Sequence, residues 1–165
     1  MTVYNSEASA GVHALSVETW HSLAQKGAAP PVRLQVRGGS MRPLIRTGRD
    51  TVTVVPMARA ARVGDIVLFR DGARYVLHRV WRVGQSRVQT FGDGCYRPDA
   101  WIDAKNILGL AVCVERGDRR IDPNARIWRA YARLWMGLRF FRKGIFYLYS
   151  AACRVRGVFH SSEDA

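Results

Sequence analysis

Acidic residues, lysine and long apolar runs are all scarce in this sequence. There are 26 Lys plus Arg against 13 Asp plus Glu, which gives a formal net charge of +13. Only Lys26, Lys105 and Lys143 are lysines, so most of the charge is arginine, which cannot act as a base in a protein. No stretch reaches the roughly 20 apolar residues of a membrane-spanning helix, and the first 30 residues hold no signal-peptide pattern. We therefore expect neither a membrane anchor nor an export signal.

Cysteine is also scarce. Cys95, Cys113 and Cys153 are odd in number, far apart and without a CxxC or Cys/His spacing. This pattern argues against a disulfide framework and against a zinc site. We expect reduced thiols, a cytoplasmic location, and neither a metal nor a cofactor.

The remaining composition is that of a folded protein. Hydrophobic residues make up 48% and charged residues 24% of 165 residues, which fits one domain with an appended element. A chain this basic is attracted to nucleic acid, anionic lipid or acidic peptides, and composition alone does not choose among them.

The N-terminal region, 1–31, reads as an arm and linker. Residues 1–14 are small and polar and are expected to be loose. A short helix is predicted from Val17 to Lys26, with Ser16 as its N-cap, and the Gly/Ala/Pro run at 27–31 ends it.

The central region, 32–122, predicts a mainly β fold. Apolar and polar residues alternate from Val32, and turn signals separate the candidate strands. These strands are expected at 32–37, 51–55, 65–70, 74–83, 86–91 and 107–115. Many short strands without a long helix between them indicate a compact antiparallel β domain.

The C-terminal region, 123–165, predicts a basic amphipathic helix. Residues 125–159 contain no acid, and apolar residues recur at steps of three and four. Such a helix is typical of a membrane interface, so we expect it to bind an anionic membrane surface. The alternative is a helix docked on the β domain or on a second copy. The residues expected to face the membrane or partner are Trp128, Arg129, Trp135, Arg139, Phe141, Arg142 and Lys143.

Several polar residues of the β region could carry chemistry. Ser40 follows two glycines at a strand end, where the backbone can turn sharply and approach a substrate carbonyl. His78 is the one histidine of four within the β region, on a face with Val76 and Val80. Two carboxylates, Asp93 and Asp99, follow in a Gly/Pro-rich stretch. Taken singly, each favours a structural role: a loop, a core histidine or turn caps.

The order of the motifs is more specific than any one of them. The chain contains Gly39-Ser40-Met41-Arg42-Pro43, Gly64-Asp65-Ile66-Val67, His78-Arg79-Val80, Gly92-Asp93 followed by Asp99, and Ile107-Leu108-Gly109. Over about 32–116 this order resembles the signal peptidase I superfamily. It is most similar to the archaeal and endoplasmic-reticulum branch, in which a histidine stands in place of the catalytic lysine.

The resemblance implies a serine peptidase-like β fold and a set of roles. Ser40 would be the nucleophile and His78 the general base, with Asp99 orienting His78 and Asp93 supporting the site. No lysine lies between Ser40 and Asp103, so His78 is the candidate base in this region. The backbone of Gly39, Ser40 and Met41 would position the substrate, and the Ser40 N–H would contribute to the oxyanion hole.

Three features depart from that family. Gly38 stands where a serine usually donates to the oxyanion, Gly94-Cys95 replaces an Asn-containing pair, and no N-terminal anchor is seen. We expect a serine endopeptidase that cuts a peptide or precursor protein at a small-residue site near a membrane surface. The alternatives are a non-catalytic module that binds a peptide or membrane protein, and a regulator that cuts itself at Ala10-Gly11. Nucleic acid is not an expected partner, and the oligomeric state stays open.

Overall fold

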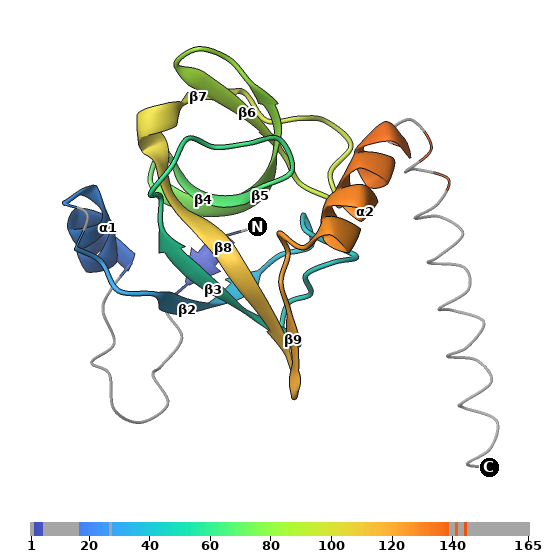
Figure 1. Cartoon of the computed structure of the whole chain (residues 1–165), viewed down its shortest axis with the longest axis horizontal. Coiled ribbons are helices and arrows are strands. Elements are labelled where there is room, and N and C mark those ends of the chain that lie inside the picture. The colour runs from blue at the N-terminus through green and yellow to red at the C-terminus, as the bar shows by residue number, and fades with distance from the viewer. Residues whose placement is uncertain (1, 5–16, 27, 139–140, 142–143, 145–165) are drawn as a thin grey trace.

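The structure is a computed structural model of the chain, and it describes residues 2–4, 17–26, 28–138, 141 and 144 (Figure 1). Within these residues, nine strands form one antiparallel sheet with a short helix near each end, which confirms the mainly β fold. The elements are β1 (Thr2–Tyr4), α1 (Val17–Gln25), β2 (Val32–Arg37), β3 (Asp50–Pro56), β4 (Ile66–Asp71), β5 (Arg74–Val83), β6 (Arg87–Phe91), β7 (Trp101–Asp103), a 3-10 turn (Ala104–Asn106), β8 (Ile107–Arg116), β9 (Arg119–Ile121) and α2 (Arg126–Gly137).

The six strands expected from the sequence are all present, and their ends agree within one residue. Three further strands, β1, β7 and β9, were not expected. Each is three residues long, which is too short for an alternating pattern to be recognised. β1 also corrects the expectation that residues 1–14 are loose, because residues 2–4 pair within the sheet.

The register of β1 brings two distant segments together. The strand order is β1-β2-β3-β8-β4-β5-β6-β7, with β9 beside β8, and the sheet curls so that β1 also reaches β5. Thr2 lies opposite Arg37 on one side and opposite Val76 on the other. Ser40 follows Arg37 by three residues and His78 follows Val76 by two, so this curl places the two candidate catalytic residues near each other.

The core has two parts, one on each side of β4 and β5. Alternate residues of β4 belong to different clusters. Ile66 and Leu68 lie in the first cluster, and Val67 and Phe69 lie in the second. Both faces of these strands are therefore buried, which explains why residues 66–69 of β4 form a continuous apolar run. His78 lies on the side of the second cluster, with its ring 6.2 Å from that of Phe69.

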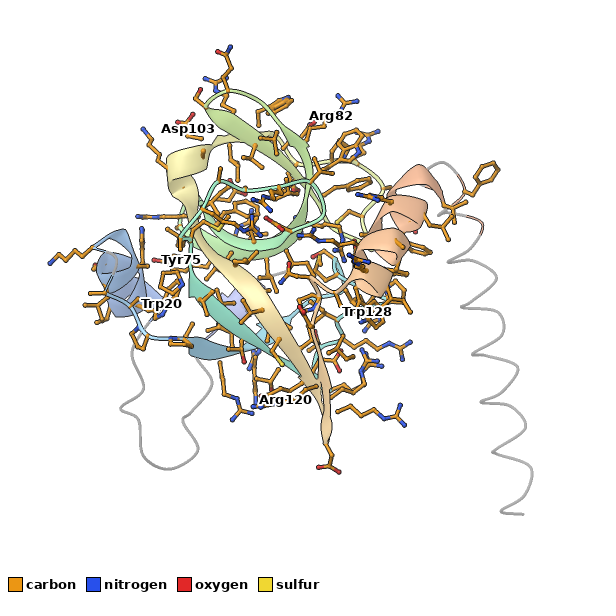
Figure 2. The ribbon with its side chains drawn as sticks, viewed as in Figure 1. Trp20, Tyr75, Arg82, Asp103, Arg120 and Trp128 are labelled. Carbon is orange, nitrogen blue, oxygen red and sulfur yellow. The ribbon has the colours of Figure 1, made fainter. Side chains whose placement is uncertain are left out.

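The helix α1 is part of the core rather than a separate arm. Trp20 is only 1% exposed and donates from Nε1 to the Pro30 carbonyl at 2.7 Å. A Cβ at Gly109 of β8 would lie 2.9 Å from the Trp20 ring, so this glycine lets the helix approach the sheet. His21 of α1 contacts Tyr75 of β5 edge-on. Figure 2 labels Trp20 on α1 and Tyr75 beside this helix.

The helix α2 has one face on the β domain. Trp128 and Tyr131 pack against the first cluster, and Ala132 is fully buried. Ile127 and Leu134 face away, 73% and 66% exposed. Arg139, Arg142 and Lys143 lie outside the described residues, as does most of the predicted tail helix. No helix in the described part of the chain is long and apolar enough to cross a membrane.

Candidate active site

The Ser40 loop is held by its own apolar residues. β2 ends at Arg37, and Gly38 takes a φ of 98°, a conformation that glycine adopts without strain. A turn follows, in which the Arg42 N–H donates to the Gly39 carbonyl at 3.0 Å. The next apolar side chains, Met41, Leu44 and Ile45, are all buried in the core. Ser40 is thereby left half-buried at the surface of a fixed loop.

A buried carboxylate, which the sequence did not single out, fixes the far end of this loop. Asp50 accepts hydrogen bonds from the Arg49 and Arg116 guanidinium groups and from the Arg46 backbone N–H. Arg116 also donates to the Leu44 carbonyl at 2.7 Å. Burial acts to raise the pKa of Asp50, but these hydrogen bonds and the Arg116 charge outweigh it and lower the pKa to about 2.

Ser40, His78 and Asp99 form a continuous chain of hydrogen bonds. His78 Nε2 lies 2.8 Å from Ser40 Oγ, and His78 Nδ1 lies 2.6 Å from Asp99 Oδ2. An ionised carboxylate can only accept, so the Asp99 contact assigns the proton of a neutral imidazole to Nδ1. Nε2 is then free to accept the Ser40 hydroxyl proton. This is the arrangement of a nucleophile, a base and an orienting acid.

Asp99 is held in place by β6. Thr90 Oγ1 donates to Asp99 Oδ2 at 2.6 Å, and Gln89 Nε2 donates to the Asp99 carbonyl at 2.9 Å. Burial acts to raise the pKa of Asp99, but hydrogen bonds from His78 and Thr90 and the electrostatic interaction with His78 lower it overall. Neither Thr90 nor Gln89 stands out in the sequence, because both residue types occur in many strands without a special role.

Asp93 forms a buried ion pair with Arg79, the residue next to His78 on β5. Arg79 Nε and Nη2 lie 2.9 Å and 2.7 Å from the two Asp93 oxygens, and both side chains are 1% exposed. Burial acts to lower the pKa of Arg79, whereas the Asp93 charge and hydrogen bonds raise it overall, so the guanidinium stays charged. Neighbouring strand residues point to opposite faces, so His78 and Arg79 meet different aspartates.

The two loops of the site touch backbone to backbone at Gly92 and Gly94. The Gly94 N–H donates to the Ser40 carbonyl at 2.7 Å. A Cβ at Gly94 would lie 2.5 Å from the Gly39 carbonyl oxygen, and one at Gly92 would lie 2.5 Å from that of Ser40. Any side chain at either position would push the loops apart. The glycines beside Asp93 therefore set the distance between the Ser40 loop and the loop that carries Asp99.

The helix α2 lies beside this loop (Figure 1), and its Trp135 contacts it. Trp135 Nε1 donates to the Asp93 carbonyl at 2.6 Å, and the Trp135 ring stacks on Tyr131 at 6.0 Å. Trp128 packs on the core. We expected both tryptophans to face a membrane or partner; instead they contact the β domain, which is the docked arrangement that the sequence left as an alternative.

An open cleft of about 970 Å³ lies beside the nucleophile. Its lining consists of Gly39, Ser40, Arg42, Gly94, Cys95, Tyr96 and Arg97. The volume is within the range of small-molecule and peptide sites. Neither Cys95 nor Cys113 forms a disulfide. Among the described residues, no three His, Cys, Asp or Glu side chains are grouped so that they could hold a metal ion.

The chain matches none of the family models, curated proteins or solved structures with which it was compared.

Proposed function

We propose that this protein is a serine endopeptidase that cuts a peptide or precursor protein at a small-residue site, in the manner of the Ser/His branch of signal peptidase I. Ser40 Oγ attacks the scissile carbonyl carbon while His78 Nε2 takes its proton. Asp99 stabilises the resulting imidazolium, which then protonates the leaving amine. Water, activated by His78, hydrolyses the acyl-enzyme and restores Ser40.

The oxyanion hole is the weakest part of this machinery. The Ser40 backbone N–H is the donor that the resemblance implies, but Gly38 has no side chain to provide a second one. Loss of one donor lowers kcat by about 10²–10³ in serine peptidases. We therefore expect slow turnover, with acylation easier to detect than multiple turnover.

The observation that supports the proposal is the Ser40–His78–Asp99 hydrogen-bond chain, with distances of 2.8 and 2.6 Å. The test is covalent labelling of the purified full chain by a peptidyl phosphonate with alanine at the reacting position, and by a penem inhibitor of signal peptidases. Mass spectrometry should find one adduct on Ser40. The adduct should be lost in Ser40→Ala and His78→Ala.

His21→Ala is the matched control, because His21 contacts Tyr75 at the far side of β5 and takes no part in the proposed reaction. It should label like the parent chain. Failure of both reagents to modify Ser40, in a chain that is folded by circular dichroism, would overturn the proposal. A non-catalytic peptide-binding module would then be the better reading, and the missing donor at Gly38 favours it.

We also propose that α2 contributes to peripheral membrane association. With Trp128 and Trp135 on the β domain, the large apolar side chains known to face outward on α2 are Ile127 and Leu134, and Phe141 beyond the helix is 67% exposed. Arg126 and Arg133 are exposed beside them. Apolar residues flanked by arginine are suited to an anionic membrane surface.

Vesicle flotation tests this membrane contact. The full chain should float with phosphatidylcholine vesicles that contain phosphatidylserine. The double variant Ile127→Ser, Leu134→Ser should bind these vesicles about tenfold or more weakly, since each substitution removes an apolar side chain from the interface. Val83→Ser, an exposed apolar position on β5, is the control and should bind like the parent chain. Equal binding by all three would contradict the proposed surface.

A further inference from the structure

The charged side chains that line the cleft beside Ser40 are all positive. Of its seven lining residues, two are arginines, Arg42 and Arg97, and none is acidic. The two aspartates of the neighbouring loop are already engaged: Asp93 is buried against Arg79, and Asp99 holds His78 and Thr90. A substrate in the cleft therefore meets positive charge with no compensating carboxylate in the lining.

Arg42 lies directly beside the nucleophile. A Cβ at Gly39 would be 3.7 Å from both Cδ and Nε of Arg42, so the arginine stem runs along the backbone that precedes Ser40. Arg97 comes from the other loop, two residues before Asp99. The two guanidinium groups thus reach the cleft from the two loops that form it.

Both guanidinium groups are exposed and lack an ion-pair or hydrogen-bond partner among the described residues. Two other arginines behave differently: the buried Arg79 binds Asp93, and the partly exposed Arg116 binds Asp50. Arg42 and Arg97, by contrast, are exposed at the cleft. They are available to a ligand.

We propose that the peptides this site acts on carry carboxylate side chains, Glu or Asp, close to the bond that is cut, and that Arg42 and Arg97 bind them. This inference rests on the proposed function and names the substrate class for it. A planar guanidinium binds a carboxylate through two parallel hydrogen bonds, which gives geometric selection as well as attraction. Nucleic acid phosphates would also be attracted, but the Ser40–His78–Asp99 chain is arranged for acyl transfer, which favours a peptide.

The experiment separates binding from catalysis. Two fluorescein-labelled peptides share an Ala-Ala core and differ only in flanking Glu or Gln residues, and their affinities for the full-length Ser40→Ala chain are measured by fluorescence anisotropy. We expect the Glu peptide to bind about tenfold more tightly at low salt, with the preference reduced at high salt. Arg42→Gln and Arg97→Gln should each reduce that preference about threefold, as expected for exposed charge pairs.

Arg119→Gln is the matched control, since it removes the same charge from β9, beside the Arg120 that Figure 2 labels at the hairpin. It should keep the preference. Equal binding of the two peptides, or an equal loss in Arg119→Gln, would overturn the inference, because the preference would then be absent or due to net charge alone. Tighter binding of a single-stranded DNA oligonucleotide with the same dependence on Arg42 and Arg97 would also overturn it.

The same variants distinguish this inference from the proposed function. If the reagents above label Ser40 but the Glu and Gln peptides bind equally well, the peptidase proposal stands and the acidic-substrate inference fails. If the Glu preference depends on both arginines but Ser40 never labels, the peptidase proposal fails and the cleft is a binding site for acidic peptides.

Discussion

Asp93 and Asp99 lie six residues apart in one loop, yet they have different partners. Asp99 contacts the imidazole of His78, and its side chain is 29% exposed. Asp93 is fully buried against Arg79. Asp99 therefore belongs to the proposed chemistry, and Asp93 to the structure that holds the loop.

Substitution of each aspartate by asparagine should separate these roles. Asp99→Asn removes the carboxylate that orients His78 and stabilises its charged form, so the labelling rate of Ser40 should fall by about 10³–10⁴, as in other Ser-His-Asp sites. Urea unfolding should change little. The measurement is the rate of adduct formation by mass spectrometry.

Asp93→Asn is the comparison variant. It leaves the Arg79 guanidinium buried without its counter-charge, so the free energy of unfolding should fall by about 3–5 kcal/mol. If Asp93→Asn instead stays as stable as the parent chain and loses as much reactivity as Asp99→Asn, the assignment of roles is wrong.

The lowered pKa of Asp50 predicts how the stability of the fold depends on pH. Its pKa is lowered from 3.8 to about 2, so its ion pairs stabilise the fold above about pH 4 and this stability is lost as the pH falls toward 2. A shift of this size corresponds to about 2 kcal/mol. Asp50→Asn should be less stable than the parent chain at neutral pH by at least this amount, with a shallower loss of stability in acid. Urea unfolding of both chains from about pH 2 to neutral pH measures this difference in stability. Parallel pH profiles for the two chains would contradict the prediction.

Among the elements, α2 contributes most directly to the site. Its Trp135 hydrogen bond to the Asp93 carbonyl ties the helix to the loop that also carries Asp99. The stacked Tyr131 ring keeps the indole in position. Any ligand of α2, including a membrane, would therefore contact a helix that is coupled to the candidate active site.

Trp135→Phe should report this coupling. The change keeps an aromatic ring but removes the N–H donor, so the unfolding free energy should fall by about 1 kcal/mol and amide exchange in 92–99 should increase. Leu134→Ala, at an exposed neighbouring position, is the control and should stay within about 0.5 kcal/mol of the parent chain. Unchanged exchange in that loop in Trp135→Phe would mean that α2 does not hold the loop.

At the scale of the whole molecule, the N-terminal segments complete the fold. β1 lies between the ends of β2 and β5, and α1 inserts Trp20 into the core. The curl of the sheet that brings Ser40 near His78 thus includes residues far from either of them.

Trp20→Ala should test the contribution of α1. Loss of a fully buried tryptophan side chain should lower the unfolding free energy by about 3–5 kcal/mol, through lost burial and the cavity left behind. Trp101→Ala is the matched control, because Trp101 of β7 is 44% exposed and should cost far less. Similar losses in the two variants would show that α1 is not part of the cooperative core.

The sequence by itself determined the longer strands and the residue types of the site. Alternation marks the longer strands because side chains in a strand alternate between two faces, and this periodicity is local. The resemblance of the motif order to the signal peptidase I superfamily also suggested Ser40 as nucleophile, His78 as base, and Asp93 and Asp99 as supporting acids. Strands of three residues gave no such signal, so β1, β7 and β9 could not be foreseen.

Only the tertiary structure decided which groups meet. The sequence could favour Asp99 over Asp93 by resemblance alone, whereas strand geometry sends His78 and Arg79 to opposite faces and pairs each with one aspartate. The partners Thr90, Trp135 and Arg116 were equally invisible, because hydrogen bonds between residues far apart in the chain depend on how the sheet curls and not on local pattern. The amphipathic pattern of 123–165 likewise predicted a helix, but packing decided that the tryptophans of α2 face the β domain and leave Ile127 and Leu134 outside.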